Sequence, residues 1–278
     1  MSGLAQALLQ ATVAARPAGD VQLSWQDLVL ASVLVFVAAG IAAWQRIGLA
    51  RGFLWGAVRA VVQLVAVGYI LTWVFAVDRW YVVLAALLVM LVAATVTVTD
   101  RHPTQRRTLG AITGFAMLAG AGLTLAYVNG VVVRVSPWYD PRYLIPLFGM
   151  IVGNAMNGAA LAAERLASEM ESRRAEVEAY LALGASPAQA SAEPVRRALR
   201  AALLPAVNGL MVVGLVTLPG MMTGQILAGA SPLLAVRYQI VVVLMLAGAV
   251  AVTSVIVVLA YRRTFFNAAE QLRVRVPV

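Results

Sequence analysis

Two asparagines one helical turn apart are the side chains in this sequence best placed for binding chemistry. Asn154 and Asn157 interrupt the apolar stretch from Tyr143 to Ala163, and their spacing places them on roughly the same face of a helix. Uncompensated amides are costly in lipid, so this face is expected to meet protein or a water-filled path. Two readings stay open: an interhelical hydrogen bond, or contact with a transported solute.

A second set of polar residues lies around a break in another apolar stretch. Pro219-Gly220 interrupts the helix that the sequence predicts from Leu199 to Met222. Unwound backbone at membrane depth is tolerated only where it is buried in protein or lines a cavity. The predicted substrate path consists of Asn154, Asn157, Thr217, Pro219, Gly220, Thr223 and Gln225.

Metal-binding chemistry has weak support in this sequence. Met221 and Met222 offer thioethers as weak metal-ligand candidates, although methionine more often serves packing. The chain has no cysteine and a single histidine, His102, which disfavours thiolate and histidine metal sites and a Ser-His-Asp triad. The sequence therefore predicts neither a resident cofactor nor a catalytic centre.

Arg59 and Gln63 share the apolar stretch from Phe53 to Val77. Arg59 is expected either to extend to the membrane surface, as long cationic side chains do, or to act in gating or at a helix interface with Gln63. No Asp or Glu lies in the middle of a predicted span, whereas ion-coupled transporters usually need a buried carboxylate relay. Energy for transport is therefore expected to come from outside the membrane segments.

The elements that position these residues are membrane-spanning helices. The 278 residues are 62% hydrophobic and only 12% charged, and apolar runs of about 20 residues recur, which is the length that spans a bilayer. We predict an all-α integral membrane protein with about seven transmembrane helices. The predicted spans are Leu28–Trp44, Phe53–Val77, Trp80–Thr99, Leu109–Val128, Tyr143–Ala163, Leu199–Met222 and Ile240–Tyr261.

The arginines predict how the helices are oriented. All 21 basic residues are arginine, and most of them lie in the loops after the first, third, fifth and seventh predicted spans. The positive-inside rule therefore predicts an outside N-terminus and a cytoplasmic C-terminus in the cell inner membrane. This orientation explains the net charge of +9 better than nucleic-acid binding does. We expect residues 1–278 to form one transmembrane domain without a soluble domain.

A charged segment, residues 164–200, separates the fifth and sixth predicted spans and is expected to project into the cytoplasm. Its apolar residues Leu166, Met170, Val177 and Leu181 fall on one helical face. Gly184 is expected to end this helix in a left-handed cap, and Ser186-Pro187 to begin a short crosswise helix. Another helix is expected to begin near Glu193-Pro194.

This cytoplasmic arm contains a sequence with a known counterpart. The run Glu178-Ala-Tyr-Leu-Ala-Leu-Gly184 resembles the coupling segment of ABC-transporter permeases, which docks on a separate ATPase. Tyr180 stands where the usual segment has a second alanine. The resemblance implies that Glu178, Ala179, Gly184, Ser186 and Pro187 contact an ATPase. Because the chain has no lysine, it has no P-loop of its own.

Further runs extend the likeness from about Leu28 to Leu272. The segments beginning at Arg59, Ile145 and Gly214 resemble the FetB-type iron-export ABC permease family, to which plant aluminium-sensitivity permeases are similar. The resemblance implies a non-enzymatic permease. Two copies of it would form a homodimer, and this dimer would bind a FetA-like ATP-binding subunit. It implies export of iron or of a related metal or small solute. Plant relatives are linked to a nucleotide-sugar.

Other functional classes stay open. A secondary transporter or channel would transport without ATP, and the missing intramembrane acids disfavour it. A nucleotide-sugar ABC permease would differ only in its substrate. A membrane scaffold would recruit a partner through the arm without transporting anything, and substrate-stimulated ATPase activity would distinguish it from a transporter.

Overall fold

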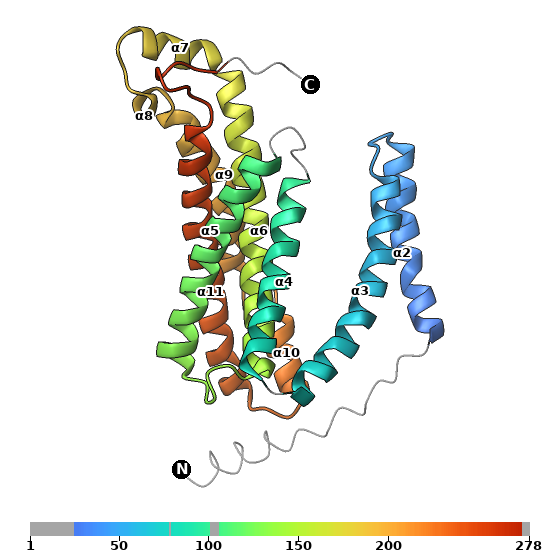
Figure 1. Ribbon diagram of the computed structural model, residues 1–278. Helices are drawn as coiled ribbons and strands as arrows, with labels where there is room; N and C mark the ends of the chain where they lie inside the picture. Colours follow the sequence, from blue (N-terminus) through green and yellow to red (C-terminus); the bar gives the residue numbers. More distant parts are fainter. Residues whose placement is uncertain (1–24, 78, 101–105, 274–278) are drawn as a thin grey trace, which may run out of the picture. The chain divides into compact units, whose positions relative to one another are not determined.

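Helices make up nearly all of the computed structural model, which describes residues 25–77, 79–100 and 106–273 (Figure 1). Within these ranges, six helices are long and apolar enough to cross a membrane, which confirms the predicted fold class. His102 lies outside the described residues. The six are α2 (Trp25–Trp44), α3 (Ala50–Val77), α4 (Trp80–Thr99), α5 (Arg106–Tyr127, continued by the π-helical η2, Val128–Val133), α6 (Pro141–Ser172) and α11 (Pro232–Arg263).

Contacts divide the chain into two compact units, and the smaller one is a helical hairpin. Helices α2 and α3 pack on each other and are joined by a short turn, in which Gly48 adopts φ +78°. Most of their large apolar side chains are exposed, including Leu34, Trp55 and Tyr69. Exposed apolar surface of this extent is expected where lipid or another membrane helix is the surrounding medium.

The larger unit is a bundle with α11 and α6 at its centre. Helix α11 packs against α5, α6 and α9 (Ala192–Val212), and α4 packs against α5 and α6. Small residues let these helices approach closely, as is usual between membrane helices. A Cβ on Gly158 of α6 would lie 2.8 Å from Val250 Cγ1 of α11, so no larger residue fits there without a shift.

Helix α9 ends earlier than the sequence suggests. The expectation that Pro219-Gly220 ends this helix is wrong, because α9 stops at Val212 and residues 213–219 are non-helical. Gly214 adopts φ +83°, a left-handed conformation that favours glycine. Pro219 instead precedes α10 (Gly220–Leu227), and its carbonyl oxygen accepts a hydrogen bond from the Thr223 backbone N–H at 3.1 Å. The break is therefore longer and begins earlier.

The arm has the helix–break–helix form that the sequence predicts. Helix α7 (Arg174–Ala182) is followed by Gly184 at φ +86°, which confirms the left-handed cap. Ser186 caps α8 (Pro187–Ala190) through a capping box with Gln189. The polypeptide then enters α9, and Figure 1 shows α7 and α8 at the end of the bundle where α6 and α11 terminate.

The arm is packed onto the bundle rather than free in solution. Leu166 and Val177 are buried at 0% and 1% exposure, in one apolar cluster with Tyr261 of α11. The segment after α11 joins the same cluster through Phe265 and Phe266. This segment folds back on itself, since the Arg273 backbone N–H donates to the Phe265 carbonyl oxygen at 2.8 Å. The arm and the ends of α6 and α11 therefore share one continuous buried cluster.

Candidate functional site

A cavity of about 280 Å³ in the larger unit contains part of the predicted path. It lies between α6, α9, the break at 213–219 and α11, and its size is near the lower end of small-molecule sites. Three predicted residues, Asn154, Thr217 and Pro219, line it together although the last two are far from Asn154 in sequence. The other lining residues are Pro205, Ala206, Gly209, Leu210, Val213, Gln239, Val243, Leu246, Ala247 and Val250.

The polar groups of this cavity are amides and a hydroxyl. Gln239 of α11 is only 7% exposed, and its buried Oε1 atom has no hydrogen-bond partner. Asn154 donates from Nδ2 to the Met150 carbonyl oxygen of its own helix at 2.9 Å, and its Oδ1 atom is still available as an acceptor. Sequence analysis missed Gln239, because a lone amide near the start of an apolar helix resembles any helix-end polar residue.

Several predicted path residues lie outside this cavity. Asn157 is exposed and does not line it. Gly220 and Thr223 are exposed on α10, and the Thr223 hydroxyl donates to the Pro219 carbonyl oxygen at 3.2 Å. Gln225 is half-buried on the same helix, and its Oε1 atom has no partner. Their role in transport stays a prediction.

Metal ligands do not gather in the described part of the chain. No group of three or more His, Cys, Asp or Glu residues there could hold a metal ion. Met221 and Met222 are both half-buried on α10. Because thioethers suit soft metals and hard ions prefer oxygen ligands, these two residues alone make a poor site for a divalent cation.

Arg59 and Gln63 belong to α3 in the smaller unit. Both are exposed, and no ion pair of Arg59 is found among the described residues. Their exposure on an apolar helix fits either predicted role, extension to the membrane surface or contact with another helix.

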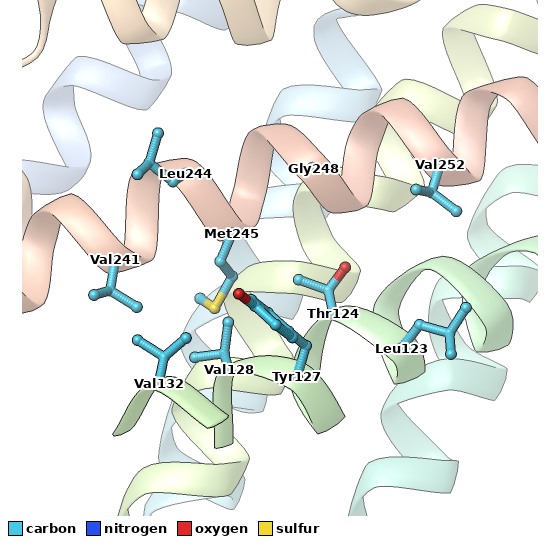
Figure 2. Close-up of a pocket in the computed structure, with 10 residues that line it drawn as sticks. All are labelled: Leu123, Thr124, Tyr127, Val128, Val132, Val241, Leu244, Met245, Gly248 and Val252. Carbon is cyan, nitrogen blue, oxygen red and sulfur yellow. The ribbon is translucent and has the colours of Figure 1, made fainter. Parts of the chain in front are cut away.

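A second cavity of about 510 Å³ lies between α5 with η2 and α11. Figure 2 shows Leu123, Thr124 and Tyr127 facing Met245 and Val252 across it. The Thr124 hydroxyl already donates to the Gly120 carbonyl oxygen at 2.7 Å, so it offers little to a solute. Apolar walls of this kind suit a lipid chain or a packed helix better than a polar substrate.

A buried carboxylate forms ion pairs within the arm and between α6 and α9. Glu169 of α6 is 5% exposed and pairs with Arg165 at 2.7 Å, Arg173 at 3.3 Å and Arg197 of α9 at 3.9 Å. The pairs with Arg165 and Arg173 have the i,i+4 spacing at which side chains of one helix meet. The link to Arg197 was missed, because it joins helices that are distant in sequence.

Arg197 also pairs with Glu193 at 2.8 Å. The hydrogen bond from Arg197 holds the pKa of the Glu193 carboxyl below its usual value, and the same bond raises the pKa of Arg197. Both groups therefore stay charged at neutral pH, and the start of α9 carries a fixed network of ions.

The tip of the arm is exposed. Leu183 is 85% exposed and Tyr180 48% exposed, so this end of the arm presents apolar surface to water. Glu178 pairs with Arg174 at 2.9 Å, as the spacing predicts. A cleft of about 610 Å³ lies between the tip and the C-terminal segment, with Glu178 and Gly184 on one side and Glu270 on the other. Ala179 is exposed beside it.

Comparisons with known proteins agree with this architecture. The family described as "Uncharacterised protein family (UPF0014)" matches residues 25–266. A UPF0014 membrane protein of Synechocystis is 40% identical over 91% of this chain and 98% of its own length. The Escherichia coli "Probable iron export permease protein FetB" is 37% identical, over 89% and 94% respectively. The rice "UPF0014 membrane protein STAR2" is 39% identical, over 88% and 84%.

The relatives cover nearly the whole chain, and the match includes both the bundle and the arm. The Arabidopsis "Protein ALUMINUM SENSITIVE 3" is 34% identical over 88% of the chain. No solved structure matches. The resemblance to FetB and to the aluminium-sensitivity proteins is thus confirmed, and the chain belongs to the UPF0014 family of membrane proteins.

Proposed function

We propose that this chain is the membrane-spanning permease subunit of an ABC transporter in the cell inner membrane. A separate ATP-binding subunit docks on the arm, and two copies of the permease pair to form the path. By analogy with the relative named as an iron export permease, the transported species is iron, a related metal or a small solute. The chain itself is non-catalytic, and ATP is hydrolysed in the partner.

The observation that carries this proposal is the construction of the arm. Its tip exposes Leu183 and Tyr180, while its base shares one buried cluster with α6, α9 and α11. An exposed apolar tip on a rigid base fits a docking element that transmits force. A flexible loop would lack the buried face, whereas this arm combines that face with an exposed tip.

The proposed motion passes from the tip of the arm to the helices at its base. Closure of an ATPase pair would displace α7 and α8, and this displacement would pass through Glu169 and Arg197, which join α6 to α9. Both helices line the polar cavity. A shift of α9 relative to α6 therefore changes the shape of the cavity that contains Asn154 and Thr217.

Co-purification with a FetA-type ATPase tests the proposal. We expect Leu183→Asp and Glu178→Lys to reduce the recovered ATPase strongly. The first variant places a charge at an apolar residue of the docking tip, and the second reverses the charge of Glu178. Glu171→Lys is the matched control, since Glu171 is also an exposed arm glutamate but lies before the tip. Equal recovery with all variants, or transport in vesicles without ATP, would refute the docking role.

A further inference from the structure

We infer that the cavity containing Gln239 is the solute-binding site, and that it takes an uncharged molecule rich in hydroxyl groups rather than a bare metal ion. The inference rests on the proposed transport function and narrows its substrate class. Three observations support the inference: an unpartnered buried amide, the chemistry of the remaining polar groups, and the absence of charge among the lining residues.

The unpartnered amide is the first observation. Gln239 is 7% exposed, its Oε1 atom has no hydrogen-bond partner, and its side chain lines the cavity. Buried amide oxygens are nearly always paired in folded proteins, so this orphan leaves an unmet hydrogen bond at the wall of the cavity. The other orphaned atoms of the described chain belong to Asn129, Gln225 and Ser254, and none of these residues lines it.

The second observation is the set of groups around Gln239. Its carbonyl oxygen and the Oδ1 atom of Asn154 accept hydrogen bonds, and the Gln239 Nε2 amide donates them. The Thr217 hydroxyl does both. A ligand hydroxyl also donates and accepts, so a polyhydroxylated molecule matches this mixed set. The apolar walls, such as Leu210 and Val243, would contact its carbon skeleton.

The third observation concerns charge. None of the lining residues carries an ionisable group. An ion in a low-dielectric site needs an opposite charge or a metal-type ligand set, and divalent cations in proteins are held chiefly by carboxylates or imidazoles. Neutral amides and one hydroxyl do not replace the hydration shell of a divalent ion. An uncharged ligand has no such requirement.

Because this chain has no cysteine, a single introduced cysteine is the only thiol that the permease contributes, and labelling is read on the permease band. Ala206 of α9 lines the cavity, whereas its neighbour Val207 does not line it and is 48% exposed. We expect Ala206→Cys in the reconstituted complex to react with a charged thiosulfonate at least about tenfold faster than Val207→Cys. The reason is that Val207 lies in the predicted span Leu199–Met222, where an outward-facing thiol would meet lipid and stay un-ionised. Equal rates would overturn the inference.

Protection identifies the ligand class. We expect glucose or myo-inositol to slow labelling of Ala206→Cys, and Gln239→Leu to abolish this protection. Asn154→Ala is a second variant that should weaken the protection. Because Asn154 is exposed, its truncation should leave folding intact. Ferrous chloride alone should give no protection that depends on Gln239. Protection by neither polyol, or ferrous protection that Gln239→Leu removes, would overturn the proposed class.

The same samples separate this inference from the transporter proposal. ATPase co-purification depends on the arm tip and should be unchanged in Gln239→Leu. A complex that retains the ATPase but shows no polyol protection would refute only the solute site. Loss of the ATPase from the wild-type chain, with Ala206→Cys still protected, would refute only the docking proposal.

Discussion

Gly120 offers a sharp test of how the larger bundle is held together. A Cβ built on Gly120 of α5 would clash with the Thr253 hydroxyl of α11, and would lie 3.1 Å from the Thr253 backbone nitrogen and 3.2 Å from its Cβ. Backbone cannot swing aside as a flexible side chain can. Gly120→Ala therefore forces α5 and α11 apart.

The matched variant is Gly122→Ala, two residues further along the same helix. A Cβ on Gly122 meets nothing within 4 Å. Each substitution gains about 1 kcal/mol of helix propensity, and overpacking at Gly120 costs about 1–3 kcal/mol. We expect Gly122→Ala to be neutral or more stable than wild type, and Gly120→Ala to lie about 1–3 kcal/mol below Gly122→Ala.

Unfolding in mixed detergent micelles, titrated with SDS and followed by tryptophan fluorescence, measures the difference. Thr253→Ala in the Gly120→Ala chain removes the clashing hydroxyl and should recover part of the loss, because the backbone contact stays. Equal midpoints for Gly120→Ala and Gly122→Ala, or no recovery with Thr253→Ala, would show that these helices are not in the close contact described.

The remaining predictions concern the arm. Glu169→Gln should lower the free energy of unfolding by only about 1–2 kcal/mol, because its arginine partners are partly exposed and regain water. The control Glu171→Gln should change it little. Thermal unfolding of both variants measures the difference, and equal melting temperatures would contradict the prediction. Gly184→Ala should cost about 1 kcal/mol, because its positive φ strains any Cβ, and equal melting temperatures would contradict this. The pKa of Glu193 is lowered, so its pair with Arg197 stabilises at neutral pH and is lost as the pH falls through that lowered value. Melting of wild type and Glu193→Gln should therefore differ at neutral pH and converge in acid; a constant difference would oppose the assignment.

The proposed docking through the arm and the proposed binding in the cavity make separable demands on the chain. The arm needs a rigid base, which Leu166, Val177 and Phe265 supply by burial. The cavity needs a helix that can stop and restart within the bundle, which Gly214 and Pro219 allow. Both features depend on a few residues within long helices, so substitutions can test each of them separately.

The sequence by itself determined the membrane class, most of the helices and the form of the arm. These features depend on local signals: apolar runs long enough to span lipid, a glycine that accepts a left-handed backbone at Gly184, and a Ser-Pro pair that starts α8. Local signals act between residues close in sequence, and so they can be read without the fold. Asn154 and Thr217 were identified for the same reason, as polar residues in apolar surroundings.

Only the tertiary structure decided which of these residues meet. It placed Gln239 beside Asn154 and Thr217, buried Glu169 against an arginine of another helix, and ended α9 at Val212. It also packed Phe265 and Phe266 into the base of the arm. Burial and pairing of this kind depend on contacts between helices far apart in the chain, and no single stretch of sequence contains that information.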